Sequence, residues 1–226
     1  MIVEVKQRNE SKQFFLDFIC DNIPINTCSQ SSFTHVGKIE LGDTKLLWNW
    51  SREPISKIPF KKFLGGKKKN YRDIIEKNLK VGHMYTFSDA ASTYYIFKYK
   101  KQTFNIYRKI AGKIFFSIYL NNIQIAAIVK DNLITDALDT YTIFLLDEYR
   151  EYLKIIMLFN GYIDNYYYGH KRAAFYGISY NNINASTKTD NFFNKEWYNY
   201  FGVNEEFLQS ITWFEAKEKI RNYKRT

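Results

Sequence analysis

Residues 147–168 read DEYREYLKIIMLFNGYIDNYYY, and this stretch decides the fold. Residues 155–159 are consecutive apolar residues that extend over more than one helical turn, so a helix here must be buried on much of its circumference. A membrane-spanning helix needs about twenty mostly apolar residues, whereas Asn160, Gly161 and Asp164 interrupt this run. The stretch therefore predicts a buried helix of a globular protein and not a membrane span.

The polar residues of this helix gather on one side of it. At about 100° per residue, Lys154, Gly161, Asp164 and Asn165 fall in one wedge, and the apolar residues occupy the wide arc opposite. Most of the predicted helix of residues 149–168 therefore faces a sheet. Gly161 costs about 1 kcal/mol of helix propensity relative to Ala, so we interpret it as a point where another backbone approaches closely.

A β-meander is predicted immediately before the helix, over residues 85–146. Asn121 and Asn122 lie between two strongly alternating runs, which is typical of a tight hairpin because Asn enters the left-handed region readily. Turns are also expected near Lys101 and Gly112. Five antiparallel strands are marked by the alternating residues Tyr95, Phe97, Tyr99; Phe104, Ile106; Ile114, Phe116, Ile118, Leu120; Ile123, Ile125, Ala127, Val129; and Tyr141, Ile143, Leu145.

The chain before the meander begins with mixed elements. Residues 1–5 alternate like a short strand, and residues 11–20 carry apolar side chains at helical spacing, which predicts a strand followed by a helix. Residues 21–32 are expected to form a polar loop. Residues 33–50 have the pattern of a hairpin that turns at Gly42.

The chain changes character at residues 51–69, which contain prolines, two adjacent glycines and a run of lysines. This composition predicts a loop or linker. Asn70 can then cap a helix that buries Ile74 and Leu79 and ends at Gly82.

The C-terminal part is predicted to be helical. Residues 191–201 and 204–224 are expected to form two helices around Gly202, with Asn204 as the cap of the second. The predicted organisation is therefore an N-terminal strand, helix and hairpin (1–50), a basic loop and helix (51–82), the meander with its hydrophobic helix (83–168) and a C-terminal helical extension (169–226), together forming one compact unit.

The composition excludes a disordered chain, since 46% of the residues are hydrophobic and 19% are aromatic. The formal net charge of +10 indicates an anionic partner such as nucleic acid or an acidic lipid surface, or else reflects the residue usage of an AT-rich genome. The N-terminal MIVEVKQRNE carries charges where a signal peptide has its apolar region. We therefore expect a cytoplasmic protein, with peripheral attachment to the membrane as an open alternative. Cys20 and Cys28 lack the spacing of a metal site and are expected to be reduced.

Motifs of catalysis and cofactor binding are absent from the sequence, which has no GxSxG elbow, Walker loop or dinucleotide fingerprint. His35, His83 and His170 are scattered without metal-ligand spacing. Glu4 and Lys6 lie two residues apart on the first strand, as in metal-dependent nucleases, but no upstream Asp completes a magnesium site. We therefore expect no catalytic residue, no metal and no cofactor.

The predicted ligand-binding residues are lysines of the 51–69 segment. A lysine near an anionic membrane contributes about 1 kcal/mol, and residues 166–168 are three tyrosines that are candidates for anchors at such an interface. The basic clusters at 98–101 and 108–113 fall at opposite ends of a strand and should not merge into one patch, which weakens the nucleic-acid hypothesis. The predicted ligand-binding residues are Lys61, Lys62, Lys67, Lys68 and Lys69.

The second half of the chain has a characteristic order of segments. YYIFKYKKQTFNIYRKIAGKIFFSIYLNNIQIAAIV is followed by YTIFLLD and then by YLKIIMLFNGYIDNYYY. Over roughly residues 83–168 this order resembles the tubby C-terminal-like superfamily, which includes the LURP-one-related and phospholipid scramblase proteins. The resemblance implies a closed barrel of about a dozen strands threaded by the helix, and binding of lipid or membrane phosphoinositide. Fewer strands are predicted before residue 83 than a full barrel requires, so either the barrel is incomplete or its missing strands lie in regions predicted as loop.

These observations predict an α+β protein in which a curved antiparallel β-sheet or barrel wraps around the hydrophobic helix, with additional C-terminal helices. The predicted function is non-enzymatic binding of an anionic lipid or another phosphate-bearing ligand. A nucleic-acid-associated basic protein is the alternative, and a metal-dependent nuclease centred on Glu4 and Lys6 is a second alternative. The sequence leaves the ligand's identity and the oligomeric state open.

Overall fold

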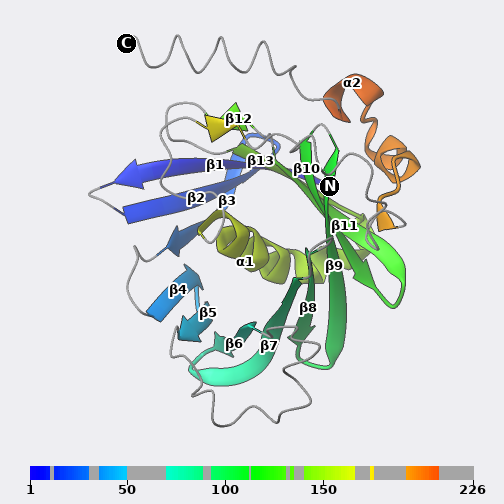
Figure 1. Cartoon of the computed structure of the whole chain (residues 1–226). Coiled ribbons are helices and arrows are strands. Elements are labelled where there is room, and N and C mark those ends of the chain that lie inside the picture. The colour runs from blue at the N-terminus through cyan, green and yellow to red at the C-terminus, as the bar shows by residue number, and fades with distance from the viewer. Residues whose placement is uncertain are drawn as a thin grey trace.

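Twelve antiparallel strands form a closed barrel in the computed structural model (Figure 1). The structure describes residues 1–10, 13–30, 36–49, 70–88, 93–111, 113–130, 133–134, 140–165, 174–175 and 192–208. The strands of the barrel are β1 (Ile2–Glu10), β2 (Gln13–Cys20), β3 (Ile23–Gln30), β4 (Val36–Leu41), β5 (Thr44–Asn49), β6 (Asn70–Glu76), β7 (Leu79–Ser88), β8 (Thr93–Tyr99), β9 (Gln102–Ala111), β10 (Lys113–Leu120), β11 (Ile123–Lys130) and β13 (Thr140–Leu145).

The ring closes between the first and the last of these strands. β1 pairs with β13 from Ile2 opposite Phe144 to Lys6 opposite Thr140, and every other strand pairs with its neighbours along the chain. The first strand of the chain thus lies beside the last strand of the barrel. The remaining described elements are β12 (Leu133–Ile134) and β14 (Ala174–Phe175), which pair with each other, and the helices η3 (Asp147–Tyr152), α1 (Leu153–Ile163), η7 (Glu196–Phe201) and α2 (Glu205–Leu208).

The α1 helix is buried along most of its length, because every residue from Ile155 to Ile163 is buried. The ring of Phe159 lies 5.1 Å from that of Tyr95 and 5.9 Å from that of Phe116, on β8 and β10. On the other side of the helix, Gly161 faces Cys28 of β3 and a neighbouring residue of β4. Figure 1 shows α1 in the middle of the ring of strands. The prediction of an antiparallel barrel together with a hydrophobic helix is confirmed.

The polar wedge of the helix is buried as well. Gly161 and Asp164 are buried, and Lys154 and Asn165 are half-buried. The close approach predicted at Gly161 is confirmed, but the approaching atoms belong to side chains and not to a backbone.

Three predictions for the first half of the chain were wrong. Residues 13–20 form β2 instead of a helix, and residues 23–30 form β3 instead of a loop. Residues 70–82, predicted as a helix, belong to the hairpin of β6 and β7. These strands complete the barrel whose missing members the sequence left open.

The errors have identifiable physical causes. In β2 the inward residue Phe18 is buried, while the outward residue Phe15 is covered by the guanidinium of Arg8 at 4.4 Å, so apolar residues on both faces imitated a helical spacing. In the segment that forms β6 and β7, Lys77 and Asn78 adopt φ values of 49° and 65° and form a two-residue turn. A helix cannot continue through these left-handed conformations.

The hairpins predicted at Gly42 and at Asn121 and Asn122 are confirmed. β4 and β5 turn at Gly42, which has a φ of 58°, and β10 and β11 turn at Asn121 and Asn122, with φ values of 50° and 65°. These left-handed conformations are the ones that a two-residue hairpin requires.

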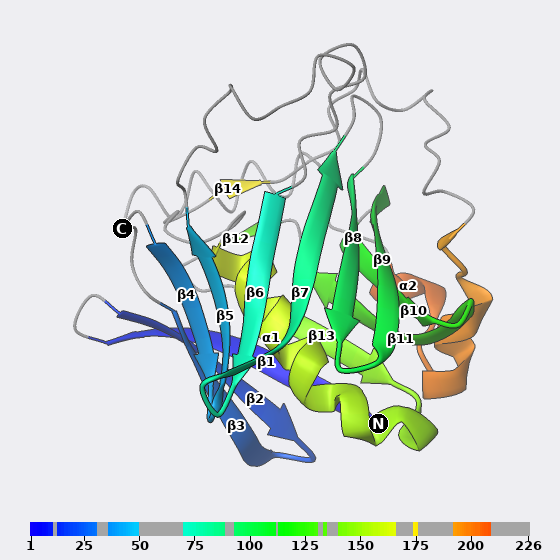
Figure 2. The same ribbon diagram turned by 90° about the horizontal axis from the view of Figure 1, so that it is seen from below.

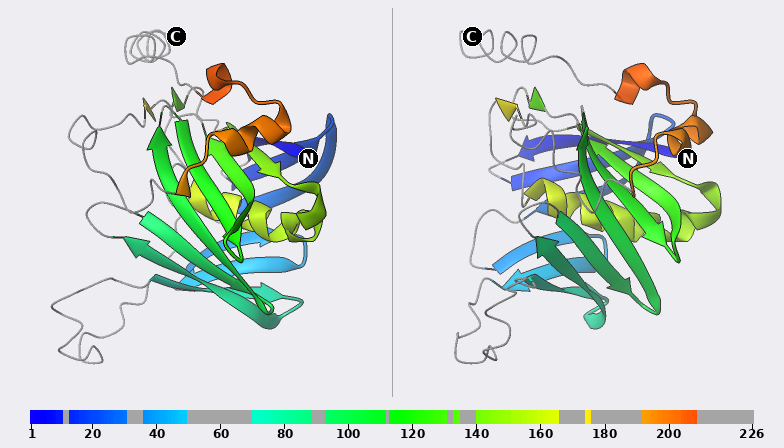
Figure 3. Two further views of the ribbon diagram at one scale, coloured as in Figure 1. Left: turned by 90° about the vertical axis from the view of Figure 1, so that its right-hand side faces the viewer. Right: turned by 45° about the vertical axis from the view of Figure 1, so that its right-hand side comes forward.

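One face of the barrel is covered from outside by the C-terminal segment. Figure 3 shows η7 and α2 against the outside of β10, β11 and β13. Phe115 and Phe144 point outward and lie 5.9 Å and 5.5 Å from the ring of Tyr198. The indole of Trp197 donates to the backbone oxygen of Gln124 at 2.9 Å. These strands are therefore buried on both faces.

The structure corrects the predicted faces of β11 and confirms the predicted cap at Asn204. A register shift between β10 and β11 moves Ile125 into the barrel core, while Ala127 and Val129 belong to the outer cluster under the C-terminal segment. In that segment, Asn204 accepts a hydrogen bond from the backbone of Phe207 at 2.9 Å, as predicted for a cap. Residues 209–224 of the second predicted helix lie outside the described residues.

We predict that Gly161→Ala destabilises the protein although Ala favours a helix. A Cβ atom at this position would lie 2.7 Å from Sγ of Cys28 and 2.8 Å from Cγ2 of Ile39. Overpacking costs about 1 to 3 kcal/mol, against about 1 kcal/mol gained in helix propensity. Urea unfolding should show a net loss on the order of 1 kcal/mol, which should shrink in a Cys28→Ala background. An increase in stability would contradict the close contact.

Candidate functional site

The two ends of the barrel are built differently. Two-residue turns join β2–β3, β4–β5, β6–β7, β8–β9 and β10–β11 at one end, which we call the hairpin end. Figure 2 shows the N terminus at this same end. At the opposite end, which we call the Asp164 end, α1 finishes and the ends of β5 and β6 are joined by residues 50–69.

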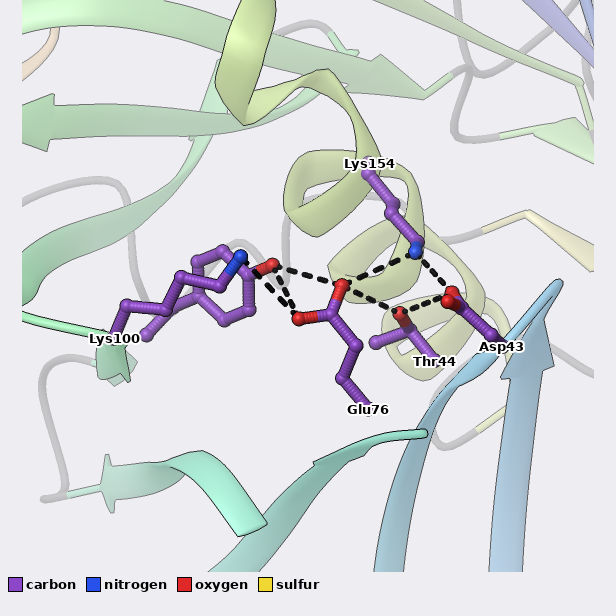
Figure 4. Close-up of polar contacts among 6 residues, drawn as sticks. Asp43, Thr44, Glu76, Lys100 and Lys154 are labelled. Carbon is purple, nitrogen blue, oxygen red and sulfur yellow. Dashed lines mark hydrogen bonds and ion pairs between the residues drawn. The ribbon is translucent and has the colours of Figure 1, made fainter. Parts of the chain in front are cut away.

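A network of ion pairs ties the start of α1 to the hairpin end (Figure 4). Nζ of Lys154 contacts Oδ1 of Asp43, in the β4–β5 turn, and lies 3.3 Å from Oε1 of Glu76, at the end of β6. Glu76 also lies 3.3 Å from Nζ of Lys100, and the hydroxyl of Tyr99 lies 3.3 Å from both of its carboxylate oxygens. Three hairpins and the helix therefore share one charged cluster.

The cluster lowers the pKa of both carboxyl groups. The hydrogen bond from Lys154 holds the pKa of Asp43 below its usual value. For Glu76 partial burial raises the pKa, but the hydrogen bonds from Lys100 and Lys154 outweigh it, and the pKa is lowered. Both carboxylates are thus stabilised in their charged form, as an ion-pair network requires.

We predict that Lys154→Met lowers the thermal unfolding midpoint at pH 7 by a small amount, because the side chains are partly exposed. The pKa values of Asp43 and Glu76 are lowered in the folded state, so their contribution is present above the usual carboxyl pKa of about 4 and is lost as the pH falls through the lowered values. The difference between the two proteins should therefore vanish near pH 3. A difference that persists there would show that packing, and not charge, is responsible.

The Asp164 end holds a buried polar cluster inside the barrel. Asp164 has no exposed surface, and its Oδ2 accepts hydrogen bonds from Gln7 at 2.9 Å and from Gln30 at 2.6 Å. Its Oδ1 accepts a hydrogen bond from the hydroxyl of Tyr141 at 2.7 Å. Strands β1, β3 and β13 thus all bind the end of the helix, and Nζ of Lys130 lies 5.4 Å from the centre of the Tyr141 ring.

Burial raises the pKa of Asp164, and this effect is larger than the opposing effects of its three hydrogen bonds and of the positive charge of Lys130. A buried carboxylate is costly unless it is paired and hydrogen-bonded. The three donors and the lysine offset part of that cost, and burial still favours the neutral form of the carboxyl group.

A buried arginine lies in the same half of the interior. Nη1 of Arg72 donates to the hydroxyl of Thr86 at 3.0 Å, and its guanidinium stacks on the ring of Tyr162 at 4.4 Å. Arg72 and Lys130 are both almost fully buried. The interior at the Asp164 end therefore carries two cations and one carboxyl group, whereas aliphatic and aromatic side chains fill the part nearer the hairpin end.

The apolar part of the interior is closely packed. A cavity between α1 and β8, β9 and β10 has a volume of only about 10 Å³, which is the space of one water molecule. Its lining is apolar. This cavity is too small for a lipid or a headgroup.

We predict that Asp164→Asn destabilises the protein by about 1 to 3 kcal/mol at pH 4, because an amide leaves one of the donors around it unpaired. The raised pKa of Asp164 adds stability that is complete below the usual value of about 4 and is lost as the pH rises through the raised value. The stability of the wild type relative to Asp164→Asn should therefore fall between pH 4 and pH 8 in urea unfolding. The exposed change Glu148→Gln serves as the control. A difference that grows with pH would contradict the assignment.

The five lysines predicted to bind the ligand, Lys61, Lys62, Lys67, Lys68 and Lys69, lie outside the described residues, as do Tyr166, Tyr167 and Tyr168. The structure does locate the strand ends beside the lysines: the segment leaves β5 after residue 49 and enters β6 at residue 70. β5 and β6 are hydrogen-bonded neighbours, with Thr44 opposite Glu76 and Leu47 opposite Asp73.

The other candidate functional residues of the sequence analysis do not come together in one site. Glu4 and Lys6 lie on the exposed outer face of β1 and pair with each other at 3.5 Å. Of the residues that the structure describes, no three His, Cys, Asp or Glu side chains group as a metal site would require. The basic clusters at 98–101 and 108–113 lie at opposite ends of β9, as predicted. Both cysteines are free.

Sequence reasoning missed the buried cluster of Asp164, Arg72 and Lys130. Asp164 carried a signal, because a carboxylate at the end of an otherwise apolar helix must find partners if the helix is enclosed. Lys130 ends a strand of apolar residues, and its side chain points into the barrel, where it lies over the ring of Tyr141 across the sheet. This contact is not visible in a sequence pattern.

No protein-family model, curated protein or solved structure matches this chain. Over the described ranges, none of the helices has both the length and the apolar character that crossing a membrane requires.

Proposed function

We propose that this protein is a non-enzymatic binding protein that recognises an anionic lipid surface through the segment of residues 50–69. One observation carries the proposal. β5 and β6 are antiparallel neighbours that two residues could join, as in five other hairpins of this barrel, yet twenty residues connect them. Connections of this length inside a compact domain are uncommon and are often functional.

The charge distribution supports the same segment. The described residues contain 17 Lys and Arg against 15 Asp and Glu, a net charge of +2, so +8 of the chain's +10 belongs to the other residues. Residues 50–69 alone contain seven Lys and Arg and a single Glu. A short segment of this charge is attracted to the negative surface of a membrane.

Several basic residues on the outer face of the described barrel lie in ion pairs. Lys38 and Lys45 pair with Glu40, Arg8 pairs with Asp17, and Lys80 and Lys100 pair with carboxylates of β6. Nucleic-acid binding proteins usually present a basic stripe on one face. A basic segment attached to a barrel that holds many of its charges in ion pairs favours a membrane surface.

We further propose that the fold is tubby-like, with the barrel enclosing the hydrophobic helix. Two features support this proposal: the number of strands in the ring, and the contacts of α1 with strands on opposite sides of it, such as Tyr95 and Cys28. Binding of lipid is the function that the resemblance implies.

The proposal predicts sedimentation of the protein with vesicles that contain phosphatidylserine or phosphoinositide, and not with phosphatidylcholine vesicles. Replacing Lys61, Lys62, Lys67, Lys68 and Lys69 with Glu should weaken binding at least a hundredfold, because each lysine contributes about 1 kcal/mol at an anionic membrane. Thermal unfolding of the variant should match the wild type, since β5 ends at residue 49 and β6 begins at residue 70.

A matched variant separates a local site from net charge. Replacing Lys217, Lys219, Arg221, Lys224 and Arg225 with Glu changes the formal charge by the same amount, and we expect it to retain most of the binding. Equal loss in both variants would contradict a site at residues 50–69. Binding of duplex DNA at about 150 mM salt without vesicle binding would favour the nucleic-acid alternative instead.

A further inference from the structure

The closed barrel has one strand that extends past its neighbour. β3 pairs with β2 over its whole length, from Ile23 opposite Cys20 to Gln30 opposite Phe14, but it pairs with β4 only from Cys28 to Gln30. Among the described residues, none pairs with the β4 side of Ile23–Thr27. Figure 2 shows the β2–β3 hairpin reaching beyond the turn of β4 and β5. We call Ile23–Thr27 the overhang.

The overhang has the side chains of a sheet edge that can pair. Ile23 and Ile25 are 64% and 40% exposed, although both are large and aliphatic. Residues 22–30 read NIPINTCSQ and contain no charged residue. Natural edge strands usually carry charges that prevent pairing with another chain, and an uncharged edge lacks that protection.

The backbone of the overhang is blocked at two positions. The register of β2 and β3 shifts by one residue between Pro24 and Asn26, which interrupts the alternation of the backbone, so the N–H and C=O of Thr27 point to the β4 side. The N–H of Thr27 is bonded to Oδ1 of Asn26 at 2.9 Å. Ile23 adjoins the turn and exchanges its bonds with β2, so the next residue points outward, and that residue is Pro24, which has no N–H.

We propose that the overhang is a latent site for antiparallel pairing with the overhang of a second copy of this chain, and that Pro24 and Asn26 keep it closed. A second copy fits because two uncharged edges meet without repulsion between like charges, and antiparallel pairing of identical strands gives a two-fold dimer. The exposed Ile23 and Ile25 would then cover each other across the pair. The two blocks remove the donors that such pairing needs.

The test compares oligomeric states by analytical ultracentrifugation at about 100 µM, a concentration suited to the weak association of a short edge. The wild type should sediment as a monomer. A Pro24→Val, Asn26→Val variant should dimerise, because Val restores one N–H and releases another. Adding Ile25→Lys should return this variant to a monomer, since a charged edge opposes pairing.

Matched controls keep the result specific to the overhang. Asn105→Val makes the same replacement on β9, which is paired on both sides, and should leave a monomer. If the double variant does not fold, Asn26→Val alone should show concentration-dependent protection of the Thr27 amide from hydrogen exchange. A folded double variant that stays monomeric, or a wild type that dimerises and is dissociated by Ile25→Lys, would overturn the proposal.

Discussion

The burial of α1 is the constraint on which the rest of the structure depends. A helix satisfies its own backbone hydrogen bonds, so it can occupy an apolar interior, but its side chains must then match what surrounds them. Phe159 meets aromatic rings of β8 and β10, and Gly161 leaves room for Cys28 where a side chain would collide. Side chains of each strand alternate between the two faces of the sheet. Strands of different composition can therefore all place apolar residues in the interior of one ring.

The two ends of the helix are held by opposite kinds of electrostatics. At the hairpin end, Lys154 meets carboxylates in a partly exposed network, where water screens the charges and each contact contributes little. At the other end, Asp164 is buried, and three donors from separate strands compensate its lost hydration. The second arrangement specifies the position of the helix more strongly, because a shift would leave buried polar groups unpaired. Both ends of the helix therefore serve to position α1 within the barrel.

The outer surface of the barrel is not uniform. The C-terminal segment covers β10, β11 and β13, whose outward residues Phe115 and Phe144 would otherwise form an exposed apolar patch. Strands β1, β2, β4 and β5 instead carry ion pairs on their outer face, as between Arg8 and Asp17. The cover had a signal in the sequence, because KIFFSIYL and IQIAAIV are apolar on both faces, and a strand of that kind is buried on both sides.

The sequence by itself determined the hydrophobic helix, the strands of the meander and the tight turns at Gly42, Asn121 and Asn122, because period, apolar run and left-handed propensity are local properties. Only the tertiary structure decided that residues 13–20, 23–30 and 70–88 are strands: their patterns are ambiguous alone, and pairing with neighbours already in the ring resolves them. The cluster around Asp164 was also beyond the sequence, since Gln7, Gln30 and Tyr141 are brought to it from positions up to 157 residues away. A contact of that range is selected by closure of the barrel and leaves no periodic trace in the chain.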